Sequence, residues 1–323
     1  STLNDDDRTV KLSVEVDKGK KVYVGNIEFL GNIKTKDNVI RREFRLKEGE
    51  LFDGSKLKRS KQRINNLNYF EDVKIDTHRG QDPDLIDILT TVTERPTGSF
   101  TVGIGFSSIE NFVFSTSITQ DNLFGNGQRL GLDAKLSSIR TDFDINFTEP
   151  RLFDSEVSLG VSAFNEDQDF LSFDSQSTGG SFSLGKNLTE YESVSVGYRF
   201  AVVEVSGVAA ADVTEFFKNE TRVTSRISPT IIHDSRDNFL NPSTGWRHVL
   251  GFELAGLGGS KFTKSSYEVT YYRPLMGKLV AAAHARINYA EGYGGEEVPN
   301  FERFFMGGAT SLRGFTLEDV GPK

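Results

Sequence analysis

The stretch that begins at Asn300 holds the combination of residues with the most specific recognition chemistry in the chain. Two consecutive glycines are followed by the tripeptide Arg313-Gly314-Phe315. Glycine adopts φ > 0 without strain, so Gly314 allows the Arg313 guanidinium and the Phe315 ring to point into one site. A guanidinium in such a turn can anchor a loop through several charged hydrogen bonds, although an exposed arginine in a glycine-rich turn has the same local sequence.

Other residues that could do chemistry lack the required spacing. The histidines fall in different segments, without the pattern of metal ligands. No cysteine is present, which excludes thiolate ligands, disulfides and a cysteine nucleophile. Asp234 and Asp237 could imitate an acid–base pair, but Arg236 and the surrounding turn residues favour capping and an Arg–Asp contact. We expect no metal, no cofactor and no catalytic residue, and predict that the chain is not an enzyme. The four histidines are His78, His233, His248 and His284.

Two further runs have simple structural interpretations. Gly125-Asn126-Gly127 is superficially similar to a phosphate loop, but its glycines are misplaced and no helical pattern follows, so a hairpin turn is expected. The acidic run Glu166-Asp167-Gln168-Asp169 is expected to be a solvated loop, with Ca²⁺ binding as a minor alternative.

Composition narrows the class of protein. The chain has 323 residues, more than one compact domain usually holds, and a formal net charge of -8. This acidic balance argues against a nucleic-acid partner. The sequence begins without the basic and apolar regions of a signal peptide, so we expect a mature form, a fragment or an expressed segment. Its 31 glycines and 26 phenylalanines are typical of an all-β chain with many turns and aromatic bands.

The first hundred residues predict a small α+β domain. Residues 1–21 are expected to contain one strand, the last of a preceding repeat, and a linker. Residues 22–95 then predict strand, helix, helix, strand, strand. Thr35 is a plausible N-cap for the first helix, which is expected to run through Phe44. The second helix is expected from Asp53 to Asn68.

After Pro96 the pattern changes to alternation with a period of two, as in Val194, Val196, Tyr198 and Phe200. Segments of about ten such residues separated by turns are typical of a transmembrane β-barrel. Alternation shows that one face is apolar, not whether that face meets lipid or a soluble core. We place about eleven strands in residues 96–323. They lie near 99–107, 111–120, 127–138, 140–149, 154–165, 177–187, 190–204, 219–233, 245–256, 263–274 and 278–291.

Loop lengths support the membrane interpretation. If the first strand leaves a periplasmic domain, the periplasmic connections, such as 149–151 and 187–189, are mostly short. The outside connections, such as 165–177 and 204–218, are mostly longer, as outer-membrane barrels require. The Arg313 segment then falls in the sixth outside connection.

Several motifs resemble those of bacterial outer-membrane assembly factors that join POTRA domains to a β-barrel. The segments that carry the likeness are Gly31-Asn32, Ile40 to Phe44, Asn68-Tyr69-Phe70 with Val73, Glu94 to Phe100, and the sixth-loop run from Asn300 to Phe315. The resemblance implies a mainly β fold: a partial transmembrane antiparallel β-barrel, about eleven of sixteen strands, preceded by an α+β POTRA domain. It also implies a location in the outer membrane of a Gram-negative cell, with the POTRA domain in the periplasm.

The resemblance further implies a function and partners. Such proteins insert unfolded outer-membrane proteins into the lipid bilayer and contact accessory assembly lipoproteins through POTRA domains. In this family the loop-six arginine, here Arg313, enters the lumen and contacts the inner barrel wall, in strands that follow this loop. The sequence ends at Lys323, so we expect those strands to be absent from it.

A barrel must close, because an unpaired edge in lipid leaves backbone groups unsatisfied. The family uses this liability, since the seam between the first and last strands opens and pairs with a substrate strand. Here the first strand, near 99–107, would supply six residues to that seam. Two of them are glycines that would weaken packing along the seam, or would simply make room inside the barrel. The expected seam residues are Phe100, Val102, Gly103, Ile104, Gly105 and Phe106.

Three alternatives stay open. The first is a TamA-like or two-partner secretion translocator of the same superfamily, against which the direct Glu94 to Phe100 junction argues. The second is a soluble β-barrel binding protein with an appended α+β module. The third is a lipid hydrolase on a barrel, which needs a Ser/His pair that the sequence does not reveal.

Overall fold

The computed structural model describes residues 2–4, 9–11, 20–107, 110–170, 172–208, 218–307, 311–312, 314–315 and 320. The chain forms two compact units, residues 1–96 and 97–323. Helices in the described part of the chain are too short or too polar to cross a membrane.

The N-terminal unit begins with two short strands, where the sequence predicted one. β1 (Thr2–Asn4) and β2 (Thr9–Lys11) pair with each other in antiparallel fashion. The aspartates at positions 5 to 7 have low strand propensity, which disfavours one continuous strand through this run.

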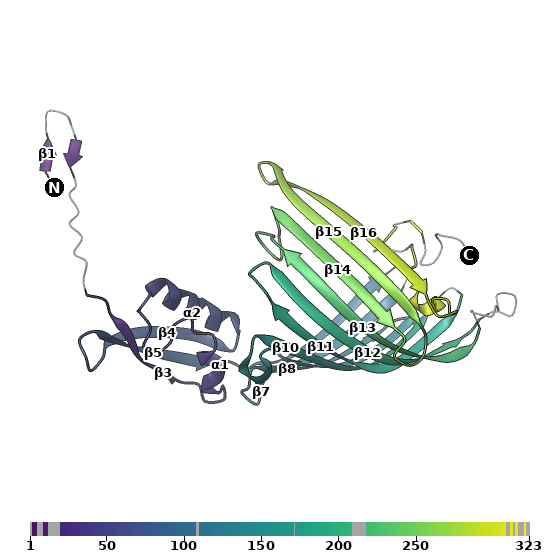
Figure 1. Ribbon diagram of the computed structural model, residues 1–323, viewed down its shortest axis with the longest axis horizontal. Coiled ribbons are helices and arrows are strands. Elements are labelled where there is room, and N and C mark those ends of the chain that lie inside the picture. Colours follow the sequence, from purple (N-terminus) through teal and green to yellow (C-terminus); the bar gives the residue numbers. More distant parts are fainter. Residues whose placement is uncertain are drawn as a thin grey trace. The chain divides into compact units, whose positions relative to one another are not determined.

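A three-stranded sheet and two helices form the rest of this unit (Figure 1). The strands are β3 (Tyr23–Leu30), β4 (Phe70–Arg79) and β5 (Leu85–Glu94), and the helices are α1 (Asp37–Arg41) and α2 (Gly54–Asn66). β5 lies in the centre, parallel to β3 and antiparallel to β4. The predicted order of elements is confirmed. Val24, Ile27, Ile40, Ile64 and Ile88 form the centre of the core and are at most 2% exposed.

The helices are shorter than predicted: α1 ends at Arg41 rather than Phe44, and α2 ends at Asn66 rather than Asn68. Asp53 caps α2, because its carboxylate accepts hydrogen bonds from the N–H groups of Ser55 (2.7 Å) and Lys56 (3.3 Å). The prediction that Thr35 caps the first helix is wrong: Lys36 precedes α1 and its side chain makes no capping hydrogen bond. Thr35 is instead buried, and its backbone N–H donates to the Glu94 carboxylate at 2.6 Å. This long-range bond outweighs the local capping preference.

Glu94 receives more than one donor at this point. The Lys34 N–H lies 3.0 Å from one carboxylate oxygen, and the Thr35 N–H lies 2.6 Å from the other. Burial by itself raises the pKa of Glu94, but the hydrogen bonds from Thr35 and Lys34 outweigh it and hold the pKa below its usual value. The ionised carboxylate therefore fixes the segment before α1 to the end of β5.

The second unit is one antiparallel sheet of eleven strands, each paired with its sequence neighbours, and the sheet curves strongly (Figure 1). The predicted number of strands is confirmed. The strands are β6 (Gly98–Ser107), β7 (Asn111–Leu123), β8 (Gln128–Leu136), β9 (Arg140–Glu149), β10 (Val157–Asp169), β11 (Asp174–Asn187), β12 (Glu192–Ser206), β13 (Glu220–Asp234), β14 (Gly245–Ala255), β15 (Phe262–Met276) and β16 (Leu279–Gly292).

The two faces of this sheet differ in chemistry. Alternate residues such as Phe100, Ile145 and Ile287 expose large apolar side chains on one face, here called the apolar face. The other face, here called the inner face, carries ion pairs such as Arg199–Glu166 (2.7 Å) and Arg247–Glu268 (3.2 Å). An exposed apolar band opposite a polar face is the arrangement of a membrane barrel.

Of two local predictions in this unit, one is confirmed and the other is wrong. The glycine-rich turn after β7 is confirmed, since Gly125 and Gly127 both have φ of 74° and Gly127 N–H donates to the Asn122 side chain (2.8 Å). The acidic run at 166–169 was predicted to be a loop, but it continues β10 and pairs with β11. Glu166, Asp167 and Gln168 also pair with β9, and Glu166 forms an ion pair with Arg199 on β12 at 2.7 Å.

Candidate functional site

The outer edge of β6 is the first candidate site. In the described part of the chain, β6 pairs only with β7, and at the far end of the sheet β16 pairs only with β15. The Asp121 N–H donates to the Thr97 carbonyl at 2.9 Å, and the register continues without interruption from Gly98↔Gln120 to Ser107↔Asn111. Backbone groups of successive residues point to opposite sides of an antiparallel strand. The N–H and C=O groups of the even-numbered residues therefore point away from β7, toward the edge that no strand of the described residues covers, here called the free edge.

Those even-numbered residues are the apolar ones. Phe100, Val102, Ile104 and Phe106 place their side chains on the apolar face, where they are 69%, 49%, 78% and 71% exposed. The same four residues thus combine apolar side chains with edge-facing backbone donors and acceptors. This coincidence suits a strand that must pair with another strand within lipid.

Gly103 and Gly105 of β6 lie on the opposite face and have different surroundings. A Cβ atom at Gly103 would lie 2.6 Å from the Ser115 hydroxyl on β7, which would have to rotate away. A Cβ atom at Gly105 would meet nothing within 4 Å. A side chain at position 103 would therefore displace the Ser115 hydroxyl, while Gly105 leaves β6 without side-chain packing at that point.

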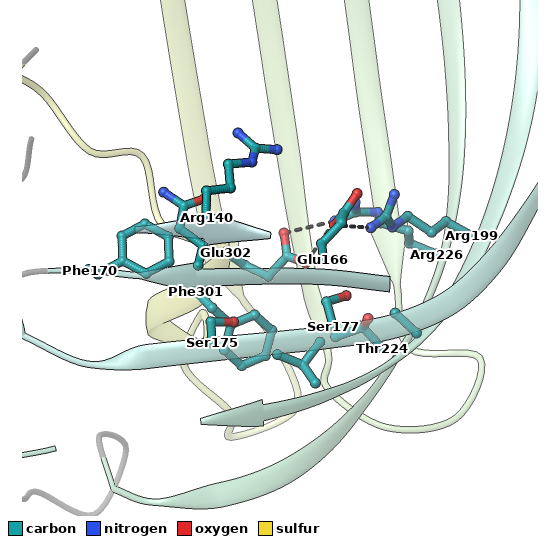
Figure 2. A pocket seen from close by; sticks show the side chains of 13 residues that line it. Arg140, Glu166, Phe170, Ser175, Ser177, Arg199, Thr224, Arg226, Phe301 and Glu302 are labelled. Atoms are coloured by element: carbon teal, nitrogen blue, oxygen red, sulfur yellow. Dashed lines mark hydrogen bonds and ion pairs between the residues drawn. The ribbon is translucent and has the colours of Figure 1, made fainter. Parts of the chain in front are cut away.

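The loop after β16 is the second candidate site. It contains a short 3-10 helix, η2 (Asn300–Glu302), and Glu302 is only 9% exposed. The Glu302 carboxylate accepts two hydrogen bonds from Arg226 Nη1, at 2.7 and 2.8 Å (Figure 2). It also accepts one from Lys264 Nζ at 2.8 Å. Arg226 belongs to β13 and Lys264 to β15, so the loop is seated on the inner face of the sheet.

Aromatic contacts also hold the loop against the inner face of the sheet. Phe301 and Phe305 pack against a buried apolar cluster of the inner face that includes Phe173 and Val203. The Phe305 ring lies 5.8 Å from that of Phe170. A polar cavity of about 190 Å³ remains beside Glu302, and Arg140, Glu166 and Arg199 are among its lining residues (Figure 2). The loop is thus held by apolar packing on one side and by ion pairs on the other.

The Arg313-Gly314-Phe315 motif is only partly visible. Arg313 lies outside the described residues, so its predicted contact stays a prediction. The positive φ predicted at Gly314 is observed, at 94°, and Phe315 is 50% exposed. Closer to the sheet, the Ser311 hydroxyl accepts from Gly307 N–H (2.9 Å) and donates to the Gly307 carbonyl (2.6 Å).

Sequence reasoning did not single out Glu302 or Phe301. The available signal was an acidic residue inside the aromatic run Phe301-Glu302-Arg303-Phe304-Phe305, because a charge among aromatic residues needs a partner when it is buried. The partners Arg226 and Lys264 could not be named from the sequence, since neither is adjacent to the run in the chain.

The remaining chemical candidates have structural roles. Arg236 binds Asp234 through two hydrogen bonds of 2.8 and 2.6 Å, which confirms the predicted Arg–Asp contact. His233 lies 3.0 Å from the Glu192 carboxylate, and His248 lies 2.8 Å from the Tyr267 hydroxyl. Among the described residues, no three His, Cys, Asp or Glu side chains are grouped to hold a metal ion.

Family models match both units of the chain. Residues 122–323 match the Omp85 superfamily domain, and residues 22–95 match the POTRA model described as a surface antigen variable number repeat. The chain is 31% identical to the outer membrane protein assembly factor BamA of Nitratidesulfovibrio vulgaris, over 98% of this chain and 41% of that protein. It is 30% identical to BamA of Neisseria meningitidis serogroup B, over 99% of this chain and 43% of that protein. The chain thus spans less than half the length of these relatives.

A solved structure of a BamA protein has a similar fold. The crystal structure of BamA from Haemophilus ducreyi lacking POTRA domains 1-3 superposes with a TM-score of 0.85 at 27% identity, over 99% of this chain and 65% of that one. The predicted fold class, a partial antiparallel barrel with a POTRA domain, is confirmed. The predicted location in the outer membrane, with the POTRA domain in the periplasm, is confirmed by the same relatives. The chain therefore belongs to the Omp85 superfamily.

Proposed function

We propose that this chain is the barrel-proximal part of an outer-membrane protein assembly factor, and that it inserts substrates by pairing their strands with the free edge of β6. The activity is one of binding and templating rather than catalysis of a covalent step. One observation carries the proposal: the residues whose backbone groups face the free edge are also those whose side chains lie on the apolar face. Kinship with the named assembly factors supports it.

The physical basis is the cost of an unpaired backbone in lipid. Each unsatisfied N–H or C=O group in the bilayer costs several kcal/mol, so an incoming strand that pairs with β6 gains far more there than it would in water. Alternation of apolar and polar side chains gives the substrate strand the correct face toward lipid. The edge therefore selects for strands that resemble those of a finished barrel.

Three further assignments belong to the proposal. Residues 1–21 end a preceding repeat, residues 22–95 form the POTRA domain nearest the barrel, and residues 96–323 form the first part of the barrel through the sixth outside loop. The POTRA sheet has β3 at one edge, and we assign that edge to unfolded outer-membrane proteins or accessory lipoproteins by the same strand addition. Arg313, Gly314 and Phe315 form the tip of a loop that Arg313 anchors on the barrel wall.

Arg313→Ala tests the loop assignment in the full-length protein. We expect the variant to lose heat stability and insertion rate, because the substitution removes a multidentate anchor. Arg313→Lys retains the charge without the planar fork and should give an intermediate result. A variant with wild-type heat stability and a wild-type insertion rate would exclude the anchoring role.

Reconstitution tests the function itself. The full-length protein in liposomes is given an unfolded outer-membrane barrel, and folding is followed as the appearance of a protease-resistant species. We expect faster folding than in empty liposomes. Correct membrane integration without acceleration would contradict the assembly function and would favour a translocator of the same superfamily, whose single passenger protein could then be sought.

A further inference from the structure

The cost of burying the Glu302 carboxylate is offset only when the loop holds its observed position on the inner face. Its side chain is 11% exposed, and those of Arg226 and Lys264 are 18% and 14% exposed. A carboxylate removed from water is costly unless charged donors replace the lost hydration. Arg226 and Lys264 supply three such hydrogen bonds from two different strands. A shift of the loop by one residue would therefore bury the charge without its partners.

The inner face also needs this carboxylate. Arg226 on β13 lies directly opposite Arg199 on β12. Like charges at opposed positions repel each other. Glu166 compensates Arg199 at 2.7 Å, while Glu253 lies 3.5 Å from Arg226. Without Glu302, Arg226 would keep only Glu253, at 3.5 Å, as an ion-pair partner, and Lys264 would lose its ion pair among the described residues.

Neighbouring residues fix the direction of the Glu302 side chain. The Glu302 N–H donates to the Pro299 carbonyl (2.9 Å) and the Arg303 N–H donates to the Asn300 carbonyl (3.0 Å), which forms the turn of η2. Phe301 packs into the apolar cluster of the inner face. Apolar packing tolerates small displacements, whereas hydrogen bonds to two fixed cations do not, so the ion pairs set the register of the loop.

We propose that Glu302 is a positioning residue: it locks the loop onto β13 and β15, and insertion requires this lock. The proposal rests on the proposed function and names the group that keeps the loop seated on the inner face while the β6 edge accepts a strand.

Hydrogen exchange of the full-length protein in liposomes tests the lock without any substrate. We expect Glu302→Gln to speed exchange of the backbone amides in 300–305 roughly tenfold, because the neutral glutamine side chain cannot compensate two cations. Glu297→Gln is the matched control: it removes an acid of the same loop whose ion pair with Arg303 is exposed, 55% and 45% for the two side chains. The control should exchange at the wild-type rate.

Insertion rates of the same variants test the role in the reaction. We expect Glu302→Gln to slow insertion several-fold and Arg226→Gln to do the same, with a double variant that is less impaired than the product of the two single effects. Wild-type exchange in Glu302→Gln would overturn the lock. Faster exchange with wild-type insertion would overturn its role in the reaction.

Two outcomes separate this proposal from the proposed function. If the wild-type protein does not accelerate insertion, the assembly function fails and the required role of the lock fails with it. If wild type inserts and Glu302→Gln matches it in both measurements, only the Glu302 proposal fails. Should Glu302→Gln not reach the membrane, Lys264→Gln carries the same test: a few-fold faster exchange supports the lock, and an unchanged rate overturns it.

Discussion

The two units of the chain place similar side chains in opposite surroundings. In the POTRA unit, Ile64 and Ile88 are 0% and 1% exposed between the sheet and the helices. In the eleven-stranded sheet, Ile104 and Ile145 are 78% and 52% exposed on the apolar face. The first unit buries its apolar residues because its solvent is water, and the second exposes them because its solvent is lipid. Exposure alone therefore says nothing about stability until the solvent is known.

Charged side chains show the opposite difference: they are more exposed in the POTRA unit than on the inner face of the barrel unit. Charged side chains of the POTRA unit are mostly on its surface, with pairs such as Arg41–Glu48, 45% and 48% exposed. In the barrel unit the charges collect on the inner face, where Arg226 and Glu302 are 18% and 11% exposed. Surface pairs contribute little, whereas a partly buried pair controls which segments can pack together. Charge thus specifies the position of the loop in the barrel unit.

The largest expected effect is in the POTRA core. Ile64→Ala should lower the free energy of unfolding of this unit by about 2–5 kcal/mol, because it leaves a cavity beneath a closed core. Hydrogen exchange of β4 and β5 in the full-length protein measures the loss. An effect below about 1 kcal/mol would show that this unit lacks a tightly packed core.

A pair of lysine substitutions tests the difference in solvent directly. Ile145→Lys places a charge on the apolar face and should cost about 2–4 kcal/mol near the bilayer centre. Ile33→Lys, at a side chain of the POTRA unit that is 91% exposed, should change stability by no more than about 0.5 kcal/mol. Thermal unfolding in detergent micelles and in liposomes measures both. Equal costs would contradict a lipid-facing surface at Ile145.

A smaller, pH-dependent effect is expected at Glu94. Its pKa is lowered in the folded protein, so the carboxylate stabilises the POTRA unit above the unfolded-state pKa of about 4.3, and this stabilisation is lost as the pH falls through the lower folded-state pKa. Glu94→Gln should cost about 1–3 kcal/mol at pH 7. The difference from wild type should shrink steadily below about pH 5. A difference that is independent of pH would contradict an ionised Glu94 as the hydrogen-bond acceptor.

Local patterns predicted the strands well, because each strand of the barrel repeats a two-residue alternation that packing does not disturb. The number of strands and the turn at Gly125 and Gly127 follow from such patterns alone. Thr35 shows the limit, since its local preference for capping yields to a hydrogen bond with Glu94, 59 residues away. The acidic run at Glu166 shows the same limit, since it pairs with β9 and β11, and Glu166 forms an ion pair with Arg199 on β12.

The candidate sites were predictable to different degrees. Alternation identified the apolar residues of β6, but not which of their backbone groups face the free edge, because that depends on the hydrogen-bond phase with β7. The seat of Glu302 was not predictable, because Arg226 and Lys264 come together with it only when a curved sheet brings distant strands around one loop.

The most direct test of the central claim is the insertion rate of Ile104→Pro in the full-length protein. Proline removes the backbone N–H that points to the free edge and leaves the β6–β7 ladder intact. Ile104→Ala is the matched control, because it removes the same exposed side chain and keeps the N–H. We predict that Ile104→Pro slows substrate insertion roughly tenfold while Ile104→Ala stays close to wild type. Equal insertion rates for wild type and Ile104→Pro would contradict the β6 edge as the site where substrate strands pair.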